Sequence, residues 1–362
     1  MTNKLETIHY CTPDEAYIHM ETCLKAGLVP YVQSSPGIGK SALAKKLAKK
    51  WNLKLIDHRL STSAPEDLSG LPQLKDGRAL FAPFAELFPL EGENLPVKRR
   101  WKDADGNEQV EYYDGWLLFL DELPSAPRSV QAAAYKLILD REVGQHNLHN
   151  RCLIMAAGNL ATDKAIVNPI GTAMQSRLVH IMLQVDFKQW LMNVALPEKY
   201  DQRVVAFLSY KNSALMDFNP NHENATFCCP RTWEFMNRLV KVGGVNSNQL
   251  KLFVGTISPG MAAEFVNFCE VYSEMVSLAQ VLADPEGCNV PFKTGLKYAT
   301  ITHLIEKVDA KNAEKVLTYI NRFDMPFRVL FFRAMTVQHP DLVQSPHFLK
   351  AITALGKYLY ES

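Results

Sequence analysis

The sequence contains no apolar run long enough to span a bilayer, and residues 1–9 lack the basic-then-apolar pattern of a signal peptide. It also lacks internal repeats and low-complexity tracts, which argues against a solenoid or a disordered chain. The formal net charge is only +1, so no overall field draws the chain to nucleic acid or to an anionic membrane. We therefore expect a cytoplasmic protein without a membrane span.

Cysteines are few and poorly spaced for cross-linking. None of the seven forms a C-x-x-C pair, and Cys228 and Cys229 are adjacent, which suits neither a disulfide nor a zinc site. Reduced thiols are the simpler interpretation. The hydrophobic fraction of 47% and charged fraction of 21% are ordinary for a globular protein, and 362 residues allow two or three domains.

Strand and helix patterns alternate in the first half of the chain. Thr12-Pro13-Asp14-Glu15 predicts a helix start with a capping box, and the helix should end near Ala26. Short apolar runs predict core strands, and amphipathic segments between them predict helices. The expected strands are 29–33, 54–60, 116–120 and 152–157, and the expected helices are 42–51 and 125–142, the latter stopped by Gly144. This order predicts an α/β fold with a parallel sheet.

The remaining segments suggest how the chain is divided. Residues 61–95 look irregular, whereas 97–113 are polar and carry Asp105-Gly106, a hairpin signal. Beyond Phe187 the strand patterns fade, and the segments 204–210, 232–241, 250–254 and 261–282 look helical or mixed. Several amphipathic helices are expected from 295 to 360. We expect an αβα nucleotide-binding domain over residues 1–190, an α-helical lid over 191–285 and a helical C-terminal extension over 286–362.

Residues 34–41, Ser-Ser-Pro-Gly-Ile-Gly-Lys-Ser, fit a phosphate-binding loop except that Ser34 replaces the usual first glycine. Glycines let the backbone amides turn toward phosphate oxygens, and the following helix adds a positive dipole. Lys40 would reach the β- and γ-phosphates, and Ser41 would bind magnesium. A chance glycine turn is the competing interpretation. The predicted nucleotide-binding residues are Ser35, Pro36, Gly37, Ile38, Gly39, Lys40, Ser41 and Ala42.

The strand at 116–120 ends in two adjacent carboxylates, Asp121 and Glu122. Parallel strands deliver such groups to the carboxyl edge of the sheet, where α/β ligands bind. Asp121 would hold the magnesium shell, and Glu122 would polarise the attacking water. Asn159 ends the next strand and could hold the same water without adding negative charge, although a plain turn residue is the alternative. Downstream of Lys40 and Ser41, the acidic pair becomes a strong signal.

Together these segments resemble AAA+ ATPases, and more narrowly their MoxR-like, dynein-related branch. The resemblance covers about residues 10–239, and the tail matches only diffusely. It rests on the phosphate-binding loop, the acidic pair and several further segments. These are 64–72 (Ala-Pro-Glu-Asp-Leu-Ser-Gly-Leu-Pro), 120–127 (Leu-Asp-Glu-Leu-Pro-Ser-Ala-Pro), 137–144 with Asp140-Arg141, 154–159 followed by Asp163 and Ser176-Arg177-Leu178, and 229–233 (Cys-Pro-Arg-Thr-Trp).

The resemblance implies a P-loop AAA+ three-layer αβα core with an ATPase activity that uses ATP and Mg²⁺. It implies that Arg177 acts as a finger on a neighbouring subunit's ATP and that Arg231 is the sensor-2 arginine of the lid. Surface salt bridges are the alternative for both arginines. It further implies a homo-oligomeric, hexameric ring that acts like a chaperone on a protein partner, such as a von Willebrand factor A domain protein or a metalloenzyme.

Two other functions remain open from the sequence. The basic stretch 98–102, with Trp101 among lysines and arginines, invites a nucleic-acid motor or loader. Acidic residues follow at once, however, so a solvated hairpin is the better interpretation. A non-hydrolysing nucleotide-dependent scaffold is the third possibility. Four intact residues argue against it: Lys40, Asp121, Glu122 and Arg177. His146 and His149 lack a metal-binding pattern and are expected to be loop residues.

Overall fold

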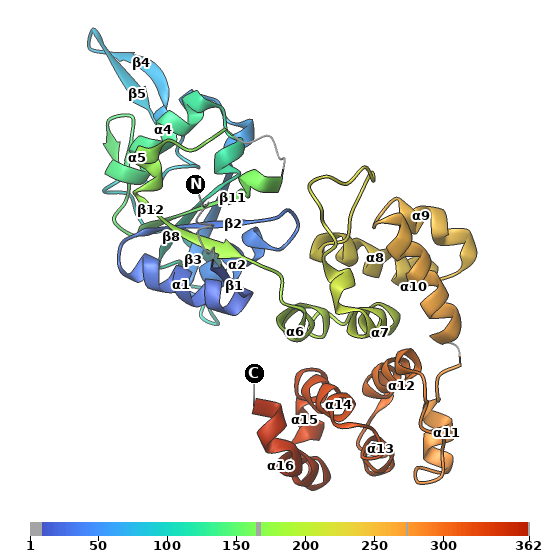
Figure 1. Ribbon diagram of the computed structural model, residues 1–362. Coiled ribbons are helices and arrows are strands. Elements are labelled where there is room, and N and C mark those ends of the chain that lie inside the picture. Colours follow the sequence, from blue (N-terminus) through green and yellow to red (C-terminus); the bar gives the residue numbers. More distant parts are fainter. Residues whose placement is uncertain (1–8, 164–167, 273, 361–362) are drawn as a thin grey trace. The chain divides into compact units, whose positions relative to one another are not determined.

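The computed structural model describes residues 9–163, 168–272 and 274–360. The chain divides into two compact units, Met1–Val185 and Asp186–Ser362 (Figure 1). Within the described ranges, no helix combines the length and the apolar character needed to cross a membrane. Unit 1 contains a large sheet with helices on both faces, whereas unit 2 is helical.

The sheet of unit 1 has six parallel strands in the order β1-β12-β2-β11-β8-β3. The strands are β1 (Tyr10–Cys11), β2 (Val29–Ser34), β3 (Leu53–Arg59), β8 (Gly115–Asp121), β11 (Cys152–Asn159) and β12 (Leu178–Leu183). All seven residues of β8 are buried, as expected for a central strand of a parallel sheet. Strands β1 and β12 were not expected from the sequence. Strand β11 separates the strand before the phosphate-binding loop from the strand that ends in the acidic pair.

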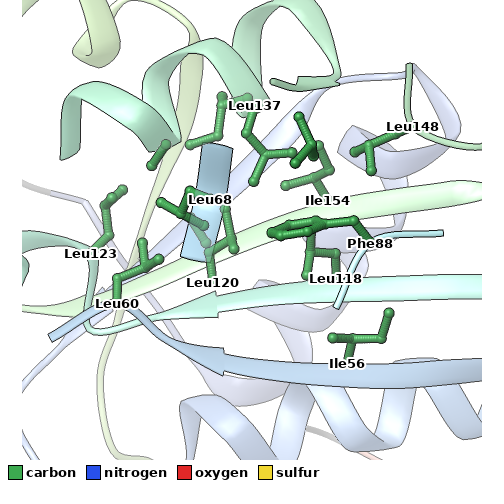
Figure 2. Close-up of a cluster of buried hydrophobic side chains, with 14 of the residues drawn as sticks. Ile56, Leu60, Leu68, Phe88, Leu118, Leu120, Leu123, Leu137, Leu148 and Ile154 are labelled. Atoms are coloured by element: carbon green, nitrogen blue, oxygen red, sulfur yellow. The ribbon is translucent and has the colours of Figure 1, made fainter. Parts of the chain in front are cut away.

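Helices cover both faces of this sheet. They are α1 (Pro13–Lys25), α2 (Lys40–Lys50), α3 (Pro65–Ser69), α4 (Arg128–Asp140) and α5 (Thr172–Gln175). Helices α1 and α2 pack on one face, where Met20 and Leu47 meet Leu117 and Phe119. Leu118 and Leu120 point to the other face, where they lie in one core with residues of α3 and α4 (Figure 2). The structure is therefore a three-layer αβα core built on a parallel sheet, and the expected α/β fold class is confirmed.

Local sequence signals explain where most of these elements start and stop. The capping box predicted at Thr12 and Glu15 is present, and α1 ends one residue before Ala26. The helix expected over 125–142 is wrong at both ends, because α4 begins at Arg128 and ends at Asp140. Arg141 stops it by adopting a left-handed conformation with φ of 56°. Gly144 instead lies in the turn between two short strands, β9 (Glu142–Val143) and β10 (His146–Asn147).

Two longer hairpins extend from the connection between β3 and β8. The second, β6 (Val97–Lys102) with β7 (Glu108–Tyr112), matches the hairpin expected over 97–113. The first, β4 (Leu71–Lys75) with β5 (Arg78–Ala82), lies in the segment expected to be irregular, and it projects away from the sheet (Figure 1). Its turn, Asp76-Gly77, has positive φ at both residues, a typical two-residue hairpin turn that the sequence already contained.

Unit 2 contains the helices expected beyond Phe187, with different breaks. The helix expected over 261–282 is two helices, because α10 ends at Tyr272 and α11 begins at Leu278. Pro326, Pro340 and Pro346 each lie in the first turn of a helix, where a missing amide hydrogen costs nothing. The helices are α6 (Phe187–Trp190), α7 (Gln202–Tyr210), α8 (Pro230–Gly243), α9 (Leu250–Val254), α10 (Pro259–Tyr272), α11 (Leu278–Ala283), α12 (Thr294–Lys307), α13 (Ala313–Ile320), α14 (Met325–Gln338), α15 (Pro340–Val343) and α16 (Pro346–Tyr360). Helix α12 packs against α7 and α10, which joins the C-terminal helices to the preceding ones.

Candidate functional site

The predicted site residues of unit 1 gather at the carboxyl edge of the sheet. In the strand register, Ser34 at the end of β2 lies beside Asn159 at the end of β11. Asp121 at the end of β8 lies beside Arg59 at the end of β3. This is the edge at which parallel α/β sheets bind their ligands.

The phosphate-binding loop connects β2 to α2, as its sequence predicted. Gly37 and Gly39 both have positive φ, 78° and 113°, which side-chain-bearing residues rarely adopt. Helix α2 begins directly at Lys40, so its unpaired amide ends face the loop. Such an arrangement suits an anionic phosphate, because the amide hydrogens and the helix dipole both carry partial positive charge.

Lys40 is almost fully buried, and its ammonium is surrounded by oxygen atoms. Its Nζ donates to the carbonyl of Ser34 at 3.1 Å, to Ser34 Oγ at 3.0 Å and to Asn159 Oδ1 at 2.9 Å. A longer contact of 3.5 Å reaches the carbonyl of Ser35. Lys40 and Asn159, 119 residues apart in the sequence, therefore meet at one point.

Ser41 and Asp121 also lie together, since Ser41 Oγ donates to Asp121 Oδ2 at 3.2 Å. Among the described residues, no three His, Cys, Asp or Glu side chains form a metal-binding group. A hydroxyl and a carboxylate nevertheless fit magnesium, which binds through one or two protein oxygens together with phosphate and water. The predicted pair is thus suited to Mg²⁺ in the presence of a nucleotide.

Glu122 has an unusual backbone and two partners for its side chain. Its φ of 60° and ψ of 30° place it in the left-handed region, which costs free energy for a residue with a side chain. Ser61 Oγ donates a hydrogen bond to Glu122 Oε2, and Arg59 Nη1 lies 3.6 Å from Glu122 Oε1. The sharp turn after Asp121 thereby directs the Glu122 carboxylate toward the segment that follows β3.

Asn159 reaches the site because Gly158 lets β11 approach the loop after Glu122 closely. A Cβ added at Gly158 would lie 2.3 Å from Pro124 Cδ and 2.8 Å from the Tyr31 hydroxyl. No side chain fits at that distance without movement of the proline. The end of β11 is therefore held directly against the turn that carries Glu122.

Asp163 follows β11 and contacts the phosphate-binding loop. Its Oδ1 accepts a hydrogen bond from Ser35 Oγ at 3.3 Å. Its Oδ2 is buried and has no hydrogen-bond partner among the described residues. Burial raises the pKa of Asp163, although the Ser35 hydroxyl and the Lys40 ammonium both oppose the shift. The sequence pointed to Asp163 only through the resemblance.

Arg177 lies away from this edge. It precedes β12, whose first residue, Leu178, is beside Val29 at the start of β2. The six residues from Val29 to Ser34 span roughly 17 Å, so Arg177 is near the opposite edge of the sheet. Its exposed guanidinium donates to the carbonyl of Ala173 at 2.8 Å and lies 5.4 Å from the centre of the Tyr135 ring.

Arg231 is in unit 2, in the first turn of α8, and its side chain is exposed. Pro230 starts this helix, and Thr232 closes a capping box with Cys229. Trp233 anchors the turn, because it is fully buried and its indole nitrogen donates to the carbonyl of Ala214 at 2.7 Å. A cation at the positive end of a helix favours binding of an anion there.

Other residues singled out from the sequence have structural surroundings. His149 lies 4.9 Å from the Trp116 ring, and His146 contacts the carbonyl of Phe81. Arg141 donates to the carbonyls of His149 and Cys152. These hydrogen bonds link the end of α4 to the start of β11. Four lysines of α2 are exposed: Lys45, Lys46, Lys49 and Lys50.

Sequence reasoning missed the side chains that surround the predicted ones. Arg59 and Ser61 contact Glu122, and the hydroxyl of Ser34 contacts Lys40. The position of Arg59 at the end of a core strand was a usable signal, because strand ends meet at the site. Ser34 was visible in the sequence only as a departure from the usual glycine.

Comparisons with known proteins find only distant structural similarity. No protein-family model matches the chain, and no curated protein is significantly similar to it. Among solved structures, it is similar to a candidate ATPase from Cytophaga hutchinsonii, with 13% identity, 94% of this chain and 87% of that chain covered, and a TM-score of 0.32. It is also similar to RuvB, the Holliday junction branch migration motor of Thermotoga maritima. The identity is 14%, 96% of this chain and 95% of that chain are covered, and the TM-score is 0.32. Because these TM-scores are so low, the interpretation of the site depends on its residues and on the strand order alone.

Proposed function

We propose that the protein is an AAA+ ATPase of the MoxR-like type, which hydrolyses ATP to remodel or activate a protein partner. One observation carries the proposal. The carboxyl edge of the sheet brings together Lys40, Ser41, Asp121, Glu122 and Asn159, which come from three separate segments of the chain. Each has the chemical character that phosphoryl transfer from a nucleotide requires.

The residues divide the chemistry among themselves. The loop amides of residues 35–42 and Lys40 bind the phosphates, and Ser41 and Asp121 hold Mg²⁺, which neutralises charge on the phosphate oxygens. Glu122 accepts a proton from the attacking water, and Asn159 orients that water. Ser61 and Arg59 fix the direction of the Glu122 carboxylate, since both contact its oxygens.

The position of Arg177 supports action on a neighbouring subunit. It lies near the opposite edge of the sheet from its own phosphate-binding loop, and its side chain is exposed. We place it at the ATP of the next subunit in a homo-oligomeric, hexameric ring, with Arg231 as the lid residue that contacts the γ-phosphate. The partner in this proposal is a protein such as a von Willebrand factor A domain protein or a metalloenzyme awaiting activation.

Substitution of Glu122 tests the enzymatic part. Glu122→Gln keeps the shape of the side chain but removes the base, so ATP turnover should fall at least a hundredfold while ATP binding persists. Glu314→Gln, in the first turn of α13, is the matched control and should leave turnover unchanged. Turnover by Glu122→Gln equal to that of the wild type would refute the assignment of Glu122.

The same assay separates the other functions. A protein that binds ATP but shows no turnover under any condition would be the non-hydrolysing scaffold. Turnover stimulated by DNA, with DNA affinity that falls steeply as salt rises, would replace the protein partner by nucleic acid. Stimulation by a co-purifying protein, with no response to DNA, is the result that we expect.

A further inference from the structure

Ser34 occupies the position at which a phosphate-binding loop usually has glycine, and its side chain is fully buried. Its hydroxyl makes two hydrogen bonds. It donates to the carbonyl of Ser35 at 2.9 Å and accepts from the ammonium of Lys40 at 3.0 Å. With its proton committed to Ser35, the hydroxyl oxygen presents its lone pairs to the lysine.

The lysine has more acceptors than protons. An ammonium carries three N–H groups. Three acceptors lie between 2.9 and 3.1 Å from Lys40 Nζ, namely the carbonyl of Ser34, the hydroxyl of Ser34 and the amide oxygen of Asn159. The carbonyl of Ser35 is a fourth, at 3.5 Å. Every proton of the ammonium therefore has a protein acceptor, and a phosphate must replace at least one of them.

Only one of these acceptors depends on the departure from glycine. The two carbonyls belong to the backbone and would persist with any residue at position 34. The amide of Asn159 comes from another strand. The hydroxyl of Ser34 is the acceptor that glycine cannot supply, so it adds one competitor for the protons that phosphate needs.

We propose that Ser34 is a positioning residue that holds Lys40 within the protein and so weakens the binding of ATP and ADP. The inference rests on the proposed nucleotide-binding function, which it deepens. A hydrogen bond to a charged group contributes enough that its loss should change affinity by roughly tenfold.

The test is isothermal titration of the full-length protein with ATP and with ADP in the presence of Mg²⁺. Ser34→Ala and Ser34→Gly both remove the hydroxyl and should tighten binding of each nucleotide by roughly tenfold. Ser34→Thr keeps the hydroxyl and should bind like the wild type. Circular dichroism of each variant establishes that it is folded before titration.

The outcomes distinguish this inference from the proposed function. If Ser34→Ala and Ser34→Gly bind with unchanged or weaker affinity than the wild type, Ser34 does not compete for Lys40 and the inference is wrong. Equal tightening by alanine, glycine and threonine also overturns it, because the hydroxyl would then have no part. If the wild type binds neither nucleotide, the proposed function itself fails.

Discussion

At the residue scale, the site depends on glycine as much as on charged groups. Gly158 carries no chemistry, yet a methyl group there would overlap Pro124 in the turn that follows Glu122. The position of Asn159 relative to Glu122 is therefore set by the absence of a side chain next to it. Gly115 has a similar constraint at the other end of β8, where an added Cβ would lie 2.4 Å from the carbonyl oxygen of Arg151.

This pair of glycines gives a matched prediction. Gly158→Ala and Gly115→Ala should each lower the free energy of unfolding by about 1–3 kcal/mol, because both crowd a packed region. Only Gly158→Ala should also reduce ATP turnover per folded molecule, since it displaces the turn that carries Glu122. Urea denaturation and an ATPase assay measure the two effects. Equal turnover in both variants would contradict the role given to Gly158.

The sequence predicted those site residues that belong to recognisable motifs. Lys40, Ser41, Asp121 and Asn159 lie together as strand-end reasoning required. The contacts of Glu122 with Arg59 and Ser61 were not predictable, because they depend on the turn after Asp121 and on its left-handed backbone. The functional roles of all these residues remain proposals.

At the scale of elements, buried strands were the easiest to predict. β8 and β11 are apolar runs of the length typical of buried strands, and the sequence therefore indicates them clearly. The hairpin β4–β5 was missed because its strands are exposed and gain little from burial, although Asp76-Gly77 marked its turn. The short edge strand β1 was missed because two residues carry no detectable period.

The contrast in burial between two leucines tests this account. Leu118 in β8 is fully buried, whereas Leu74 in β4 is 85% exposed. Leu118→Ala should lower the free energy of unfolding by about 2–5 kcal/mol, through lost burial and a cavity. Leu74→Ala should change it by less than about 0.5 kcal/mol. Similar urea midpoints for the two variants would show that the core of unit 1 is not where we place it.

At the scale of the whole molecule, the proposed ring makes activity depend on neighbours. Arg177→Ala alone should lower turnover about a thousandfold, the scale expected for an arginine acting in trans. Mixed with Glu122→Gln subunits, which are themselves inactive, it should regain turnover, because some sites then combine an intact Glu122 with an intact Arg177 from the neighbour. No regain of turnover in such mixed rings would contradict a role for Arg177 on a neighbouring subunit.

Each unit also contains a buried thiol that reports on its opening. Burial raises the pKa of Cys152 in unit 1 and of Cys228 in unit 2 to about 12. Because the thiolate is the reactive form, a raised pKa leaves little of it at pH 8. Both cysteines should resist iodoacetamide in the native protein and react after denaturation, as measured by mass spectrometry. Rapid labelling of either one without denaturant would mean that its unit opens readily.

The turn Asp76-Gly77 has a practical consequence. Both residues are exposed at the end of a hairpin whose strands are themselves largely exposed. Exposed loop tips of this kind tolerate inserted sequence. A cysteine for a fluorophore, or a short crosslinkable tag, can therefore be placed there. Such a probe would report which molecule approaches the hairpin during turnover, without altering the chemistry that drives it.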